Sequence, residues 1–270
     1  MASSFNRIDH IVILAENLDR AIATYRRLGF TVTPGGAHPG GTHNALVPFQ
    51  DGTYLELIAF QEPERSVQAS EHRWYPYLST GGGIIDFCLD VDDVAAAVGE
   101  IGARGLDYRG PVPGARTRLD GAQVSWRLGQ PPLDRTGELP FFIDDITERA
   151  VRVPGDEAAI HANGVVGVRA IVIAVRDLAE ATDLYGKLLD QPTPPHAAEE
   201  AHTADAVIYR VGDQQIMLAY PSGPDSPLVE RIQRRGDGPY EIVMLAEGLE
   251  EERLIGPEEA DGARILIQPA

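Results

Sequence analysis

The sequence is poor in cysteine and in basic side chains, and each shortage excludes a class of protein. Its one cysteine, Cys88, permits neither an intramolecular disulfide nor a zinc site built from cysteines. Cys88 lies in the apolar run IIDFCL, which favours a small buried residue over a nucleophile. Only 23 Lys and Arg stand against 41 Asp and Glu, a net charge of −18. This balance argues against nucleic acid and anionic membranes as partners, because both attract clustered Lys and Arg.

Long apolar segments are also missing. No run approaches the length of a transmembrane helix, and the first residues, MASSFNRIDH, show neither the basic start nor the apolar stretch of a signal peptide. We therefore expect a soluble, cytoplasmic protein. With 270 residues, 43% of them hydrophobic, the chain can form one large domain or two ordinary ones.

A pattern of strand, polar turn and helix occurs repeatedly along the chain. Its four copies are HIVILAENL (10–18), DFCLDVDDV (86–94), AIVIAVRDL (170–178) and EIVMLAEGL (241–249). In the first three copies an Asp or Asn in the turn can cap a helix of about three turns. The fourth copy leads into EEERLIG and has no full helix behind it.

Further strand-like runs follow the first two helices. They are FTVTP, THNALVPF and TYLELIAF after the first helix, and LDYRG, AQVSWRL and LPFFID after the second. The turn Gln50-Asp51-Gly52 between two of these runs is a hairpin signal. Each unit is therefore a βαβββ module. Because one such module cannot cover both faces of its sheet, two modules must join around a shared concave surface.

The modules predict an α+β fold of two domains. The first domain spans residues 1–150, with modules at 5–62 and 82–146. The second spans residues 160–270, with a module at 165–222 and a truncated module at 236–270. The linkers are Glu62 to Gly82 and Asp145 to Gly167.

Polar side chains on the concave face are the candidates for a functional site, because side chains alternate along a strand. The four copies carry His10, Asp86, Ala170 and Glu241 in the first strand, and Glu56, Phe142, Met217 and roughly Leu266 in the last. Only the first copy has an ionisable group at both positions. A buried carboxylate such as Glu56 needs a cation, a hydrogen-bonding partner or a proton.

Two interpretations of this pair remain open. His10 and Glu56, with Asp86 from the partner module, can give a divalent metal one nitrogen and two oxygen ligands and leave positions for a substrate. The alternative is a polar cluster without a ligand, in which Glu56 pairs with His10, with an arginine or with the backbone.

Longer stretches make the pattern more specific. They are GGAHPGGTHN (35–44), DGTYLELIAF (51–60), Asp120-Gly121 with Trp126, and LPFFID (139–144). With the paired modules, these stretches resemble the vicinal oxygen chelate superfamily, which includes glyoxalase I, extradiol dioxygenases and bleomycin or fosfomycin resistance proteins. They resemble the bacterial glyoxalase-like proteins of that superfamily most specifically. The resemblance is strong over residues 5–146, thinner over 165–225 and faint beyond.

The resemblance implies a divalent metal, such as Zn, Ni, Mn or Fe(II), held by a first-strand His, Gln or Glu and a last-strand Glu of paired modules. His10 and Glu56 match that pattern, and Asp86 occupies the first-strand position of the second module. Phe142 stands where a second carboxylate is expected. A full set of four protein ligands is therefore missing, unless Glu241 completes it through a different pairing of modules.

The glycine-rich segment offers further candidate ligand contacts in His38, His43 and Asn44. Glycines let the backbone approach a small molecule closely, and Asn and His side chains can orient a polar ligand. An ordinary connection over Pro34 to Gly41, with Asn44 bonded to the backbone, explains the same residues equally well.

One arginine and one tryptophan complete the candidates. Arg116 or Arg118 can hold a carboxylate or enediolate oxygen as a bidentate cation, and we place Arg118 among the ligand-binding residues. Trp126 can form an apolar wall of the cleft, although a Trp in a central strand also fits simple core packing.

The expected function is that of a glyoxalase-like protein with a small oxygen-rich substrate, acting as a monomer or homodimer. As a lyase, isomerase or dioxygenase-type enzyme, it would use His10 and Glu56 as catalytic residues and a metal as Lewis acid. The alternative is a binding protein without turnover, like the resistance members of the superfamily, in which Trp126, Phe142, Tyr54 and Phe141 floor the cleft.

Overall fold

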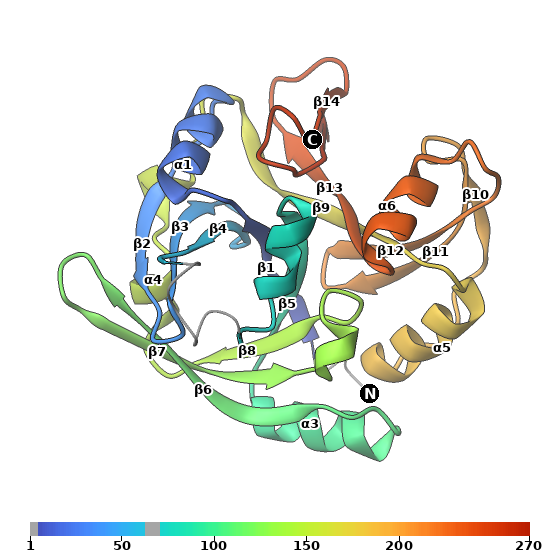
Figure 1. Cartoon of the computed structure of the whole chain (residues 1–270), viewed down its shortest axis with the longest axis horizontal. Helices are drawn as coiled ribbons and strands as arrows, with labels where there is room; N and C mark the ends of the chain where they lie inside the picture. The colour runs from blue at the N-terminus through green and yellow to red at the C-terminus, as the bar shows by residue number, and fades with distance from the viewer. Residues whose placement is uncertain (1–4, 63–70) are drawn as a thin grey trace.

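The first half of the chain forms a closed barrel in the computed structural model, which describes residues 5–62 and 71–270 (Figure 1). The strand order is β1-β4-β3-β2-β6-β7-β8-β5. The strands are β1 (Phe5–Leu14), β2 (Thr33–Ala37), β3 (Thr42–Pro48), β4 (Tyr54–Phe60), β5 (Gly83–Val91), β6 (Arg109–Arg118), β7 (Gln123–Gln130) and β8 (Phe141–Asp145). Short helical turns lie between and after them, at η1 (Tyr75–Thr80), η2 (Leu133–Arg135), α4 (Arg149–Arg152) and η3 (Asp156–Ala159).

The second half forms a 7-stranded sheet in the order β10-β11-β12-β9-β13-β15-β14. Its strands are β9 (Val165–Ala174), β10 (Ala197–Glu199), β11 (Ala204–Val211), β12 (Gln214–Pro221), β13 (Gly238–Ala246), β14 (Arg253–Ile255) and β15 (Ile265–Pro269). The α+β class and the repeated modules are thereby confirmed. The division into domains 1–150 and 160–270 stays a prediction.

The same capping chemistry starts the helix of each of the first three modules. The helices are α1 (Leu18–Arg27), α3 (Val94–Ala103) and α5 (Leu178–Leu189). Their N-caps are Asn17, Asp93 and Asp177, and each cap side chain accepts a hydrogen bond from a backbone N–H three residues later. These bonds satisfy amide groups that the helix itself leaves without partners. None of the helices in the described ranges is long and apolar enough to cross a membrane.

Two strands differ from their predicted positions. β2 occupies Thr33–Ala37, so it begins at the end of the predicted run FTVTP and continues into the segment that the sequence suggests as a connection, while Phe30 and Val32 pack into the core before the strand. β6 extends to Arg118, well beyond the predicted run LDYRG, so that Arg116 and Arg118 lie on a strand. The predicted hairpin at Asp51 is confirmed: β3 and β4 pair antiparallel, and Asp51 Oδ1 accepts from the Thr53 N–H at 2.8 Å.

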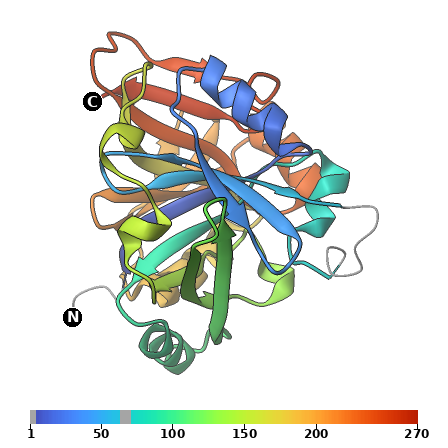
Figure 2. The same cartoon turned by 90° about the vertical axis from the view of Figure 1, so that its left-hand side faces the viewer.

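One apolar core holds the two halves together. The side chains of Ile11 and Ile13 point away from the barrel interior and share a core with Ile171 and Ile173 of β9. Contacts of β5 with β13 and of β1 with β11 continue this seam. Figures 1 and 2 show the second sheet lying along one side of the barrel. The barrel interior is lined by a separate cluster that includes Val12.

A helix that the modules do not predict covers the concave face of the second sheet. This helix, α6 (Pro227–Arg235), is capped by Ser226 and lies across that sheet (Figure 1). Its Leu228 and Ile232 pack against Ala170 and Val172, which belong to the face that corresponds to the barrel interior. The second half therefore fills with its own helix the space that the barrel leaves open.

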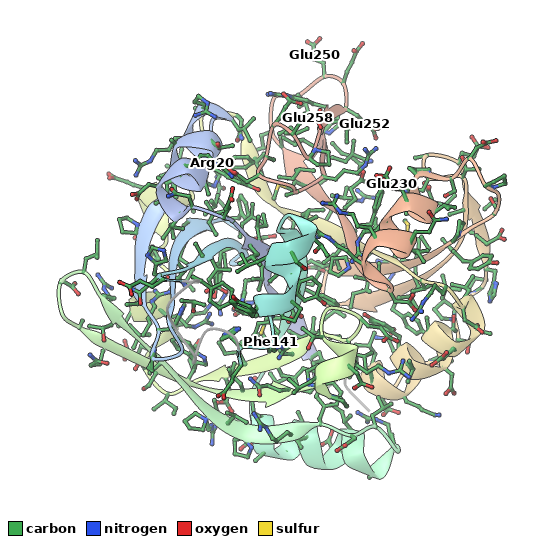
Figure 3. The ribbon with its side chains drawn as sticks, in the orientation of Figure 1. Arg20, Phe141, Glu230, Glu250, Glu252 and Glu258 are labelled. Atoms are coloured by element: carbon green, nitrogen blue, oxygen red, sulfur yellow. The ribbon has the colours of Figure 1, made fainter. Side chains whose placement is uncertain are left out.

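The acidic residues near the end of the chain lie on the surface, as the sequence suggests. Glu250, Glu252 and Glu258 are exposed and project from loops of the second half (Figure 3).

Candidate functional site

A cavity of about 250 Å³ lies inside the barrel. Polar and aromatic side chains face it from several strands and from the linkers. The lining includes His10, His38, Thr42, Asn44, Tyr54, Glu56, His72, Trp74, Arg116, Trp126, Phe141 and Arg152. The cavity is small for a ligand pocket and fits a compact metabolite.

The His10 ring is fixed through its Nδ1 atom, whereas its Nε2 atom lies near Glu56. Its ring stacks on Tyr54 with 4.6 Å between centroids. Its Nδ1 lies 2.7 Å from Asp9 Oδ1, and its Nε2 lies 3.6 Å from Glu56 Oε2. An ionised Asp9 can only accept, so Nδ1 carries the proton and donates. In the neutral ring, Nε2 is then the basic nitrogen.

Two arginines keep Asp9 ionised. Burial by itself raises the pKa of this carboxyl, but Arg152, the hydrogen bond from His10 and Arg149 together lower it well below its usual value. Arg152 grips both carboxylate oxygens, at 2.9 and 3.0 Å. It also donates to the hydroxyl of Tyr54 at 2.8 Å and to Asp145. Arg149 donates to Asp9 as well. The segment that joins the two halves thus fixes the His10 ring through Asp9.

Glu56 is positioned by Asn44, which links it to the glycine-rich strand. The Asn44 side chain accepts from the Gly36 N–H at 3.0 Å and donates to Glu56 Oε1 at 2.6 Å. A Cβ at Gly35 would lie only 1.9 Å from Asn44 Oδ1, and one at Gly36 would meet the carbonyl oxygen of Thr117 at 2.2 Å. These glycines therefore make room for the Asn44 amide and for the neighbouring strand β6.

Two further histidines border the cavity in neutral form. Burial lowers the pKa of His38, and burial together with the nearby Arg73 lowers that of His72 to about 4. His38 Nδ1 bonds to the hydroxyl of Thr42 at 2.9 Å, and its Nε2 lies 3.9 Å from Glu56 Oε1. His72 Nδ1 accepts from the backbone N–H of Trp74.

Asp86 makes other bonds instead of facing His10 and Glu56. Its Oδ2 accepts from Arg73 Nη2 and from Trp74 Nε1, both at 2.7 Å, and its Oδ1 accepts from the Phe87 N–H. Within residues 5–62 and 71–270, no three His, Cys, Asp or Glu side chains are arranged to hold a metal ion. The donor set does not fit a divalent metal, since Asp86 would first have to release Arg73.

In the second module Phe141, not Phe142, occupies the position that corresponds to Glu56. In the first module Val12 pairs with Glu56, and in the second Cys88 pairs with Phe141. Phe141 lines the cavity and is labelled in Figure 3. Phe142 faces the outer core, where it stacks on Tyr108. The predicted position is wrong by one residue, because neighbouring side chains on a strand point to opposite faces.

The remaining predicted ligand residues divide between the interior and the exterior. His38, Asn44 and Trp126 line the cavity, whereas His43 and Arg118 are not among its lining residues. His43 and Asn44 are neighbours on β3, so their side chains point to opposite faces of the strand. Arg118 bonds to the carbonyl oxygen of Val151 at 3.0 Å and to Asp120.

Three lining residues from outside the modules were missed in the sequence. His72 and Trp74 come from the linker Glu62 to Gly82, of which residues 63–70 lie outside the described ranges, and Arg152 comes from the linker after β8. A tryptophan or an arginine in an irregular segment gives no periodic signal. Their presence in the linkers beside the paired modules is the one sequence feature that indicates that the linkers reach the site.

Comparisons with known proteins agree with this architecture. Residues 8–189 match the family model described as a glyoxalase-like domain. No curated protein has a matching sequence. A hypothetical protein from Staphylococcus aureus superposes with a TM-score of 0.72 over 97% of this chain and 99% of its own, at 16% identity. A mutant of 4-hydroxymandelate synthase from Streptomyces coelicolor gives a TM-score of 0.61 at 14% identity, over 90% of this chain and 72% of that one.

A further solved structure shares the fold. A fusion protein of a xylose isomerase-like TIM barrel and 4-hydroxyphenylpyruvate dioxygenase gives a TM-score of 0.55 at 16% identity, covering 92% of this chain and 37% of that one. At these identities the likeness concerns the fold alone. The family match spans most of the chain, and the paired modules repeat in both halves. This protein therefore belongs to the glyoxalase-like domain family and has the fold of the vicinal oxygen chelate superfamily.

Proposed function

We propose that this protein is a glyoxalase-like enzyme that moves a proton on a small oxygen-rich metabolite inside the barrel, with Glu56 and His10 as the catalytic residues. The observation that carries the proposal is the pairing of Glu56 Oε2 with His10 Nε2 at 3.6 Å on the cavity wall. Both groups have their other side fixed, by Asn44 and by Asp9. Oriented acid and base groups of this kind are what proton transfer requires.

The chemistry needs no further group for its proton balance. Glu56 takes the proton from a carbon next to a carbonyl group, and the electron pair of the broken C–H bond moves onto the carbonyl oxygen. His10 Nε2 can accept that proton from Glu56, because Asp9 stabilises the resulting imidazolium. An epimerisation results if the proton returns to the same carbon on its other face. In an α-hydroxy carbonyl compound, the hydroxyl proton passes to the enolate oxygen and the carbon-bound proton returns to the former carbonyl carbon, which gives an isomerisation. Neither route includes a step through a metal.

Proton exchange with solvent tests this function. Wild-type protein is incubated in deuterated buffer with 2-oxo acids, 2-oxoaldehydes and hydroxy-acid thioesters, and deuterium uptake at carbon is followed by NMR. We expect uptake in at least one compound and a loss of about 10²-fold or more in Glu56→Gln. Glu16→Gln, on the exposed surface, serves as the matched control. Uptake at the same rate in Glu56→Gln, or none in the wild type, would contradict the proposal.

A binding protein without turnover is the second candidate, and the aromatic walls of the cavity favour it. Trp74, Trp126 and Phe141 present apolar surface that can hold the apolar part of a ligand. In this case a ligand would be recovered unchanged after long incubation. Glu56→Gln would weaken its binding without affecting any reaction.

A further inference from the structure

Arg116 is a buried cation without a counter-ion. Its side chain lines the cavity, and the residue is only 3% exposed. One bond is made, from Nη2 to the carbonyl oxygen of Arg152, while Nε has no hydrogen-bond partner. Among the residues that the structure describes, Arg116 takes part in no ion pair. An uncompensated buried charge is strongly unfavourable, so a bound partner would be stabilising here.

Three other arginines of the first half of the chain, including the fully buried Arg152, do have carboxylate partners. Arg152 binds the carboxylates of Asp9 and Asp145, and Arg73 binds Asp86. Arg118, two residues along the same strand, pairs with Asp120. Burial lowers the pKa of Arg116 and the charge of Glu56 raises it, but the oxygens of Glu56 lie against Asn44 and His10.

We propose that Arg116 holds a carboxylate of the substrate, so that the substrate class is small carboxylic acids. The planar guanidinium group offers paired N–H donors, which match the two oxygens of a carboxylate. His38 and His72 do not compete as cations, since burial favours their neutral forms. The aromatic walls then receive the apolar part of the acid.

This inference rests on the proposed function for its orientation of the substrate. With the carboxylate at Arg116 on β6, the rest of the molecule extends across the cavity toward Glu56 and His10, on β4 and β1. The carbon that exchanges its proton is then one that reaches Glu56 while the carboxylate stays at Arg116. Arg116 would act as a binding and orienting residue and would also stabilise negative charge that develops on the substrate.

The protein carries a built-in reporter for testing this. The sequence contains two tryptophans, and both Trp74 and Trp126 line the cavity. Phenylacetate and phenylacetamide are titrated against tryptophan fluorescence, because they share shape and differ in charge. We expect phenylacetate to bind the wild type about tenfold or more tightly than phenylacetamide. The preference should vanish in Arg116→Gln.

Two further variants keep the test decisive. Arg118→Gln lies on the same strand outside the cavity and should keep the preference for the acid. Arg116→Lys retains the charge and should keep part of it, and this variant decides the matter if Arg116→Gln does not fold. Equal binding of acid and amide by the wild type, binding of neither, or an undiminished preference in Arg116→Gln would overturn the inference.

The binding assay separates the two proposals. A preference for the acid that depends on Arg116, with deuterium uptake that does not depend on Glu56, would leave the carboxylate site standing and remove the catalytic function. Deuterium uptake that depends on Glu56, with no preference for the acid, would support the catalytic function and remove the carboxylate site.

Discussion

Asp9 and His10 are neighbours in sequence, yet the carboxylate of Asp9 turns back to accept a hydrogen bond from its neighbour's Nδ1 at 2.7 Å. Successive residues of a flat strand point to opposite faces. The contact is possible because the pairing of β1 with β5 shifts register between Ile8 and His10. Arg152 and Arg149 then hold the carboxylate from the side of the linker.

Replacing Asp9 with Asn should destabilise the protein by about 3 kcal/mol, because Arg152 would remain buried with a single carboxylate partner. The measurement is urea unfolding at neutral pH. Asp120→Asn provides the control, since Asp120 is an exposed partner of Arg118 and its loss should leave the midpoint unchanged. A midpoint of Asp9→Asn equal to that of the wild type would show that the network contributes nothing to folding.

Replacing Gly35 with Ala should disturb the site through Asn44. The added Cβ would lie 1.9 Å from Asn44 Oδ1, so the amide must move and Glu56 loses its fixed donor. We expect a loss of about 1–3 kcal/mol in unfolding free energy, as for other overpacked positions. Gly40→Ala is the matched control, because its Cβ would be 3.5 Å from the nearest atom, on His72. Equal unfolding midpoints for the two variants would refute this role of Gly35.

The sequence points to the proposed catalytic pair, His10 and Glu56, but not to its surroundings, and the reason is physical. His10 and Glu56 stand out because each interrupts an apolar strand, and the capped helices repeat at regular places. Arg152 and Trp74 lie in irregular linkers, so only the folded chain brings them to the cavity. The hydrogen bond from Arg73 to Asp86 likewise depends on the position of a linker side chain in the folded protein, and the spacing of residues in the sequence does not predict that position.

The stability of the second half should depend on pH through His202. Burial alone lowers the pKa of this ring, but the hydrogen bonds and charges of Glu241 and Glu199 outweigh burial and raise it. Arg264, bonded to Glu241, and Tyr240, packed on the ring, are the other groups facing the pair. Protonated His202 therefore stabilises the folded protein. The full contribution is present below the pKa of the ring in the unfolded chain, about 6.5, and it is lost as the pH rises through the pKa of the ring in the folded protein.

The difference in unfolding free energy between wild type and His202→Gln should therefore shrink as the pH rises above about 6.5. Urea unfolding at several pH values measures it. His196→Gln removes an exposed histidine of the same half and should give no such trend. A difference for His202→Gln that stays constant with pH would contradict the assignment.

Metal content should be low and independent of Glu56. We expect plasma mass spectrometry to find the same substoichiometric metal in wild type and in Glu56→Gln, both purified without a metal affinity column, because Asp86 is bound by Arg73 and Trp74. Added zinc, nickel, manganese or iron(II) should not change the melting temperature. Near-stoichiometric metal that disappears in Glu56→Gln would instead support the ligand set His10, Glu56 and Asp86.

The shared core has a consequence for how the two halves can diverge. Ile11 and Ile171 belong to one continuous interior, so a substitution on the outer wall of the barrel must be matched on the second sheet. The interior of the barrel is free of this constraint, because its apolar side chains form a cluster separate from the shared core. Substitutions inside the barrel can therefore alter ligand preference while the interface between the halves stays fixed. The second half, whose interior is filled by α6, then serves as a constant support for the barrel.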